Sequence, residues 1–450
     1  MAAEGAMRMT TKLIRDAVIV TMNRTNDVIT GDVLIQDDVI AQVGGRIDGG
    51  RADVIVDAGG KALLPGFVQT HVHLCQTLFR GRADDLALID WLRKRIWPME
   101  AAHDEESVYY SALLGIGELI RSGTTTILDM ETVRHTDAAF RAIEESGIRA
   151  IAGKVMMDHG TDVPLPLQEK TDDSLRMSVD LLERWHGAAG GRIQYAFCPR
   201  FVVSCTEELL IAVRDLSERY NVMVHTHASE NETEIAIVEA ERGMRNVVYL
   251  DHIGLARPNL ILAHSIWLND EEKRIIRQRG VKVTHCPGSN LKLASGIAQV
   301  PELIAAGVSV GIGADGAPCN NNLDMFQEMR LTALLHKVKH GPTAMDAKTV
   351  LRLATIGGAE VLGMADRIGS IEVGKKADLQ LLDLEDFHVY PSYEADWFSR
   401  VVYAATRGDV DTVWIDGEAV MEGKIVRTID RRRVLQQSDR CLRDLLGRIG

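Results

Sequence analysis

The stretch Pro65-Gly66-Phe67-Val68-Gln69-Thr70-His71-Val72-His73 marks the point at which the sequence changes its rhythm. Before it, Leu13–Met22, Gly31–Val43 and Asp53–Asp57 alternate in the manner of β-strands. After it, up to about residue 338, short apolar runs alternate with segments of helical periodicity. The stretch therefore separates a strand-rich beginning from a long α/β part.

Eight apolar runs follow one another in this α/β part. They are Phe67–His73, Thr124–Met130, Ile148–Asp158, Ile193–Arg200, Val222–Glu230, Leu260–Leu268, Val281–Pro287 and Val308–Gly316. Helical patterns between them include Glu105–Arg121, Asp137–Glu145, Leu175–Trp185, Glu207–Arg219 and Asp270–Gln278. Strands buried on both faces, each followed by a helix, are typical of a parallel barrel. The sequence predicts a (β/α)₈ TIM barrel.

The segment after the barrel returns to strand alternation, over Ile371–Leu384 and Val410–Val426, with turns at Gly374-Lys375 and Asp416-Gly417. We expect these strands to join the N-terminal ones in one small β-sandwich domain. The predicted organisation is thus a composite β-sandwich domain of residues 1–66 and 371–428, a barrel of residues 67–370, and a charged C-terminal helix of residues 429–450.

The composition excludes several kinds of partner. The 450 residues carry a formal net charge of −13, whereas a nucleic-acid backbone requires a basic face. No apolar run reaches the ~18–20 residues of a membrane span, and Met1–Lys12 lacks the apolar core of a signal peptide. The six cysteines form no CxxC pair. We expect a cytoplasmic protein, a homo-oligomer, with no nucleic-acid or membrane partner.

Metal-capable side chains end several of the predicted strands, which is where a barrel carries its reactive groups. They are His71 and His73, His225, His227 and Glu230, then His264, His285 and Asp315. A spacing of two places His71 and His73 on one face of a strand, so both can bind one ion. A divalent ion with an open position lowers the pKa of water to about 7. A carboxylate that does not bind the ion then suits proton transfer, and Glu230 is the candidate.

These motifs resemble the mononuclear deaminase branch of the amidohydrolase superfamily, which includes adenosine-type nucleoside deaminases, guanine deaminase and triazine hydrolases. The resemblance covers nearly the whole chain. It rests on HxH at residues 71–73, HxxE at 227–230, His264, GxDGxxxNN at 313–321, Leu64–Phe67 and Gly369–Asp378.

The resemblance implies a role for each matching residue. Its metal ligands are His71, His73, His227 and Asp315, and Asp315 also accepts a proton from the attacking water. It implies that Glu230 shuttles a proton to the ring nitrogen and leaving group, that His264 hydrogen-bonds the attacking oxygen, and that His285 lies behind the ligands or is structural. Strand four, Ile193–Arg200, lacks the lysine that bridges two metals in related barrels. One divalent ion follows, Zn²⁺ in the first place, with Fe²⁺ or Mn²⁺ as alternatives.

The motifs that concern the substrate match two different kinds of deaminase. Asn320, within Gly313–Asn321, and Glu100, within Trp97-Pro98-Met99-Glu100, match adenosine-type deaminases, in which the glutamate binds ribose hydroxyls. Lys154 stands near a position at which that family holds a homocysteine carboxylate. Gln76 and Arg200 match guanine deaminase instead, in which they contact the purine.

We therefore predict a metal-dependent aminohydrolase of a small heterocyclic substrate. An adenine nucleoside such as 5′-deoxyadenosine, 5′-methylthioadenosine or adenosine is expected. Guanine or 8-oxoguanine deamination and triazine or pterin hydrolysis stay open as alternatives. A cyclic-amide hydrolase would use overlapping ligands, whereas a non-catalytic barrel would lack ligands that this chain retains.

Overall fold

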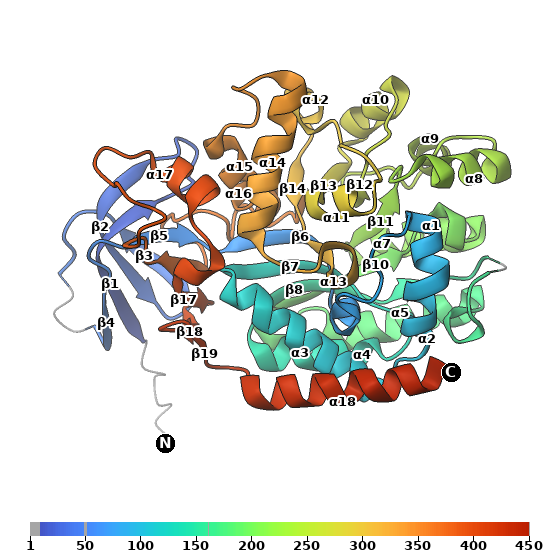
Figure 1. Ribbon diagram of the computed structural model, residues 1–450, viewed down its shortest axis with the longest axis horizontal. Helices are drawn as coiled ribbons and strands as arrows, with labels where there is room; N and C mark the ends of the chain where they lie inside the picture. Colours follow the sequence, from blue (N-terminus) through green and yellow to red (C-terminus); the bar gives the residue numbers. More distant parts are fainter. Residues whose placement is uncertain (1–9, 49–51, 161, 450) are drawn as a thin grey trace, which may run out of the picture.

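Eight parallel strands close into a barrel in the computed structural model, which describes residues 10–48, 52–160 and 162–449 (Figure 1). The barrel strands are β6 (Phe67–His73), β7 (Thr124–Met130), β8 (Arg149–Gly153), β10 (Ile193–Pro199), β11 (Met223–Ala228), β12 (Leu260–His264), β13 (Lys282–His285) and β14 (Val310–Ile312). Neighbours in this order pair in parallel, and β14 pairs with β6 to close the ring. The predicted barrel is confirmed. Two short strands, β9 (Val155–Met156) and β15 (Asp315–Gly316), extend it at the carboxyl ends of β10 and β6.

Helices surround the barrel at the predicted places. They include α3 (Glu105–Arg121), α4 (Thr136–Ser146), α5 (Thr171–Trp185), α7 (Glu207–Tyr220), α8 (Glu232–Arg242), α10 (Asp270–Arg279) and α14 (Met325–His340). Local chemistry sets their limits. Asp104 caps α3 by accepting from the backbone N–H of Ser107, and Gly147 ends α4 with a φ of 80°.

Strands from both ends of the chain form a second, single sheet beside the barrel (Figure 1). Its strands are β1 (Thr11–Val20), β2 (Val28–Gln36), β3 (Val39–Val43), β4 (Val54–Asp57), β5 (Ala62–Pro65), β16 (Leu379–Leu382), β17 (Val410–Ile415), β18 (Glu418–Glu422) and β19 (Ile425–Val426). The junction is antiparallel, with Leu379 opposite Pro65. The sheet has its own apolar core, to which Ile14, Ile35 and Trp414 belong.

Two predicted strands were wrong in extent. Gly31–Val43 is broken into β2 and β3, because Asp37 adopts a left-handed backbone with a φ of 53° and reverses the chain. In Ile371–Leu384 only Leu379–Leu382 is a strand. The turn predicted at Gly374-Lys375 is confirmed, with a φ of 90° at Gly374, and the residues around it form no strand.

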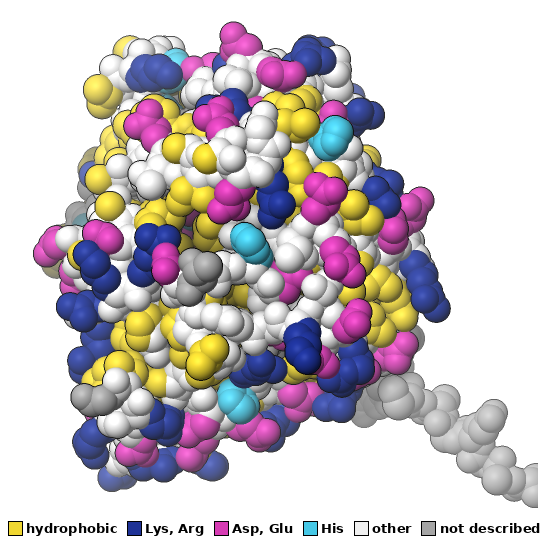
Figure 2. Space-filling model, turned by 90° about the vertical axis from the view of Figure 1, so that its right-hand side faces the viewer, with side chains coloured by type: hydrophobic (Ala, Val, Ile, Leu, Met, Phe, Trp, Pro, Cys, Tyr) yellow, Lys and Arg dark blue, Asp and Glu magenta, His cyan; other side chains and the backbone are white. Residues whose placement is uncertain are grey.

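The C-terminal helix α18 (Arg431–Ile449) packs along α3 on the outside of the barrel (Figure 1). Residues 1–9, at the start of the predicted small domain and of the Met1–Lys12 segment, and Gly450 lie outside the described residues. Within the described ranges, no helix combines the length and apolar character needed to cross a membrane. Lysines and arginines are interspersed with acidic side chains on the face shown in Figure 2.

Candidate metal centre

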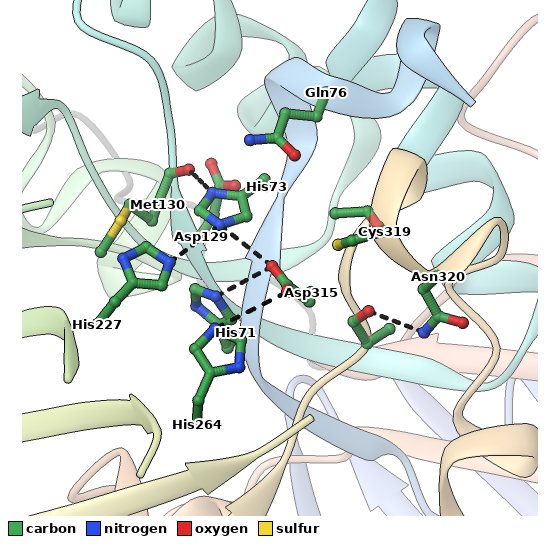
Figure 3. A network of polar contacts seen from close by, with 12 residues as sticks. His71, His73, Gln76, Asp129, Met130, His227, His264, Asp315, Cys319 and Asn320 are labelled. Atoms are coloured by element: carbon green, nitrogen blue, oxygen red, sulfur yellow. Dashed lines mark hydrogen bonds and ion pairs between the residues drawn. The ribbon is translucent and has the colours of Figure 1, made fainter. Parts of the chain in front are cut away.

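Four histidines and one aspartate converge at the carboxyl ends of the barrel strands (Figure 3). Asp315 Oδ1 lies 3.2 Å from both His71 Nε2 and His73 Nε2. His227 Nε2 lies 3.4 Å from His73 Nε2. His264 Nε2 faces the second oxygen of Asp315 at 3.8 Å. The fold therefore brings strands one, five, six and eight together around one point.

Backbone carbonyls fix the protonation of two of these rings. His73 Nδ1 lies 2.6 Å from the carbonyl oxygen of Met130, and His227 Nδ1 lies 2.7 Å from that of Arg200. A carbonyl oxygen only accepts hydrogen bonds, so each Nδ1 must carry the hydrogen. Each Nε2 then presents a lone pair to the centre, as a metal ligand requires.

In His71, a side chain instead of a backbone carbonyl determines which ring nitrogen carries the hydrogen. Its Nδ1 lies 2.7 Å from Nε2 of His225, whose own Nδ1 lies 3.1 Å from the carbonyl oxygen of Ile261. Because Ile261 can only accept, His225 donates through Nδ1 and accepts through Nε2. His71 consequently donates through Nδ1, and its Nε2 is also left with a lone pair.

The Nε2 atoms of three histidines and the Asp315 carboxylate are therefore all hydrogen-bond acceptors, and they face one another without a donor between them. Burial lowers the pKa of His71 to about 4 and holds the pKa of His227 well below its ordinary value, so neither ring gains a second proton at neutral pH. Apart from the Asp315 carboxylate, buried His71 Nε2 has no polar partner. A cation between these atoms resolves the conflict. Imidazole nitrogens with one carboxylate form the donor set of a divalent site.

The geometry is compatible with one ion. His71, His73 and Asp315 offer ligand atoms that lie within 4.8 Å of one another, and so do His71, His227 and His264. Both groups share His71, so within the described ranges they define one centre rather than two. The fourth barrel strand, β10, contributes no lysine to it.

A second carboxyl group lies beside the centre. Glu230 is buried two residues after the end of β11, and its Oε2 lies 3.5 Å from His264 Nε2. Burial raises the pKa of Glu230 to about 7, with the Asp315 charge adding to the shift. A carboxyl group with such a pKa can both give and take a proton at neutral pH. Asn290 Oδ1 accepts from His264 Nδ1 at 2.9 Å and orients that ring.

The backbone at this rim is held in uncommon conformations. His264 and Asp315 have φ values of 68° and 61°, in the left-handed region that side chains seldom adopt. Gly313 permits the close approach behind them, since a Cβ there would lie 2.6 Å from the carbonyl oxygen of His71. Such strained positions persist where surrounding contacts hold them, and they gather at functional sites.

A second polar group, with Arg200 and Gln76 in the lining, forms another wall of the same pocket. The Arg200 guanidinium binds both carboxylate oxygens of Glu100, with Nη1 at 2.6 Å from Oε2 and Nη2 at 3.2 Å from Oε1. Gln76 donates to the same Oε1 at 2.9 Å, which leaves its own buried Oε1 without a hydrogen-bond partner. Three residues predicted separately from the sequence thus form one network.

Members of both polar groups line one pocket. It has about 390 Å³ of space between atoms, its open mouth included. Its lining combines His73, His227, His264, Glu230 and Asp315 with Gln76 and Arg200 and with the apolar side chains of Leu88, Trp91, Leu92, Phe201 and Leu293. An apolar pocket with few convergent polar groups suits a flat heterocycle.

Five predicted site residues are not among those that line this pocket. His71 and Glu100 belong to the two polar groups just described, whereas Lys154, Asn320 and His285 lie outside both groups. Lys154 is buried elsewhere, with Nζ at 2.6 Å from Glu169 and at 2.9 Å from the carbonyl oxygen of Val155. Asn320 donates to the carbonyl oxygen of Ala314 and to Glu328, so it braces the loop that carries Asp315 (Figure 3). His285 forms no hydrogen bond through either ring nitrogen and packs near the ring of His336.

Sequence reasoning also missed two residues that orient the centre. The sequence places His225 among the metal-capable strand residues, two positions before His227, and this spacing is the available signal. Asn290 lies in α11 (Pro287–Lys292), and no local sequence pattern connects it to His264. Both act through contacts with residues distant in sequence, 154 positions for His225 and His71 and 26 for Asn290 and His264.

A closed (β/α)₈ barrel with imidazoles and a carboxylate gathered at its carboxyl rim defines a class, the metal-dependent hydrolases built on this barrel. The profile of the Amidohydrolase family matches residues 62–420. The chain belongs to this family.

Relatives of known name are similar over almost the whole length. A 5′-deoxyadenosine deaminase of Methanobrevibacter smithii is 43% identical, over 97% of this chain and 98% of its own. A 5-methylthioadenosine/S-adenosylhomocysteine deaminase of Desulforudis audaxviator is 41% identical, over 96% and 99%.

Among solved structures, an adenosine deaminase from Xanthomonas campestris with bound zinc superposes with a TM-score of 0.91 at 35% identity, over 97% of this chain and 99% of that one. An atrazine chlorohydrolase from Arthrobacter aurescens has a TM-score of 0.90 at 23% identity, over 96% of this chain and 100% of that one, which shows the shared fold alone.

Proposed function

We propose that this protein is a zinc-dependent deaminase that hydrolyses the exocyclic C–N bond of an adenine nucleoside and releases ammonia. The observation that carries the proposal is the placement of Glu230, buried 3.5 Å from His264 beside lone pairs that converge on one point. The deaminase names of relatives at about 40% identity support it. A divalent ion held by His71, His73, His227 and Asp315 would lower the pKa of a bound water molecule.

The chain's own residues account for the proton movements. Water adds to the ring carbon that bears the amino group, and one of its protons passes to the Asp315 carboxylate. Glu230 delivers its own proton to the adjacent ring nitrogen. Asp315 then gives its proton to the amino group, which leaves as ammonia, while the hydroxyl proton of the adduct passes to Glu230 and restores the starting state. The sum is substrate plus water giving the oxo-purine and ammonia, with no other reactant.

The pocket favours a neutral substituent at the 5′ position of the ribose. Among the described residues that line it, Arg200 is the single lysine or arginine, and its charge is paired with Glu100. The ammonium of Lys154 is paired with Glu169 outside the pocket. A homocysteine carboxylate would therefore meet no free cation. We propose 5′-deoxyadenosine and 5′-methylthioadenosine as better substrates than S-adenosylhomocysteine.

One screen tests both parts of the proposal. Ammonia release is measured with 5′-deoxyadenosine, 5′-methylthioadenosine, adenosine, S-adenosylhomocysteine, guanine and 8-oxoguanine. We expect the highest kcat/KM with the first two. Good turnover of guanine without ammonia from any adenine nucleoside would contradict the substrate assignment and leave the reaction class in place.

Guanine is the second candidate because of one observation. Gln76 Oε1 is a buried acceptor without a partner, beside the pocket and the Arg200 guanidinium. Guanine offers N–H donors that could meet this oxygen. A guanine deaminase of E. coli is 28% identical, with a TM-score of 0.82.

Cytoplasmic location and homo-oligomerisation stay predictions from the sequence.

A further inference from the structure

We infer that His225 is a positioning residue for the metal centre, which fixes the tautomer of His71 through a relay that ends on the carbonyl oxygen of Ile261. The inference rests on the proposed metal-dependent function and assigns a role to a residue that does not contact the ion. His225 is buried within the barrel, in β11, two residues before His227.

The relay has one consistent arrangement of hydrogens. Ile261 O accepts from His225 Nδ1 at 3.1 Å, so the hydrogen of the neutral His225 ring is on Nδ1. His225 Nε2 must then accept, and it lies 2.7 Å from His71 Nδ1. This bond selects the His71 tautomer whose Nε2 lone pair faces Asp315. The opposite His71 tautomer would place a hydrogen on Nε2 and a second lone pair against His225.

His71 is the exception among the three histidines that we assign as ligands. His73 and His227 are oriented by backbone carbonyls, of Met130 and Arg200, which no side-chain substitution removes. The orientation of His71 depends on a side chain that can be replaced. Partners of this kind typically contribute about 10–100-fold to metal affinity.

The test compares replacements of His225 that differ in hydrogen-bonding capacity. His225→Gln offers an amide oxygen to His71 and an N–H to Ile261, so it should retain the relay. His225→Leu fills similar volume without an acceptor, and His225→Phe is a second such variant for the event that leucine impairs folding. His336→Leu is the matched control, because His336 is equally buried but lies on α14, near His285.

The main readout is the affinity of the full-length protein for Zn²⁺, measured by competition with a chromophoric chelator. We expect His225→Leu and His225→Phe to weaken it by roughly 10–100-fold, and His225→Gln by less than about tenfold. His336→Leu should match the wild type. The absorption spectrum of the Co²⁺-substituted protein should differ from that of the wild type in His225→Leu and His225→Phe. It should be close to that of the wild type in His225→Gln. Thermal unfolding of the metal-free proteins reports packing separately.

The possible outcomes are distinct. Equal losses with Gln, Leu and Phe, or no loss with any of them, would overturn the role of His225. A loss that follows the thermal stability of the metal-free variants instead of their hydrogen-bonding capacity would also overturn it. Failure of the wild type itself to bind Zn²⁺ would overturn the proposed metal-dependent function, a result separate from the variant series.

Discussion

The two polar walls of the pocket differ in whether their buried polar atoms have hydrogen-bond partners. At the metal centre, the Nε2 atoms of His71, His73 and His227 face one another and Asp315 without hydrogens to share. At the second wall, Glu100 takes hydrogen bonds from Arg200 and Gln76, its charge is balanced by Arg200, and the single unmatched acceptor of the network is Gln76 Oε1.

This difference shows which wall depends on a bound group. Unmatched buried acceptors are costly, so the first wall requires an ion. The second wall is already organised and can hold its shape before substrate arrives. Removal of the ion should therefore affect chemistry and stability together, whereas changes in the second wall should affect specificity. The predictions below test this contrast, from the largest expected effect on turnover to the smallest.

Removal of the metal by a chelator should abolish ammonia release, and added Zn²⁺ should restore it. It should also lower stability, since a ligand present at 100 times its Kd stabilises the folded state by about 2.7 kcal/mol. Elemental analysis of the active protein should find one ion per chain. Full activity in metal-free protein, or two tightly held ions, would refute the single-ion centre.

Glu230→Gln should lower kcat by about 10²–10⁴-fold, because it removes proton transfer and little else. Zn²⁺ content should stay at the wild-type level, since Glu230 is not among the proposed ligands. Steady-state kinetics and elemental analysis of the same sample check both points. A variant with near-wild-type kcat would exclude Glu230 as the proton shuttle.

Glu100→Ala should lower kcat/KM for 5′-deoxyadenosine by roughly 10–150-fold, which corresponds to ~1.4 kcal/mol for each tenfold. We expect most of this loss to persist with 2′,3′-dideoxyadenosine, because the Glu100 carboxylate already orients Arg200 and Gln76. Glu100→Gln is the matched control for volume. A loss confined to substrates with ribose hydroxyls would support the sequence-based role of Glu100 as their acceptor.

Lys154→Met should leave kcat/KM for 5′-deoxyadenosine within about twofold of the wild type, because Lys154 does not line the pocket. It should lower the free energy of unfolding by about 3–5 kcal/mol, since the buried Glu169 loses its partner. Denaturant unfolding measures this, and Lys154→Met/Glu169→Gln should recover part of the stability. A large loss of kcat/KM with unchanged stability would instead support the sequence-based role of Lys154 in substrate binding.

The sequence by itself determined the barrel and the residue types of the proposed metal centre. Strand and helix periodicities are local, and a proposed ligand such as His71 or Asp315 stands where its strand ends. The same local information could not separate β2 from β3, because it did not reveal that Asp37 adopts a left-handed turn.

Only the tertiary structure decided which partner each polar side chain binds. Lys154 and Glu100 both carry charges that could bind a substrate, yet Lys154 is paired with Glu169, and Glu100 with Arg200. The tautomer of His71 likewise depends on His225, which lies 154 positions away. The physical reason is that a hydrogen bond is a property of two atoms in space. A residue type fixes what a side chain can donate or accept, and the fold fixes which partner it meets.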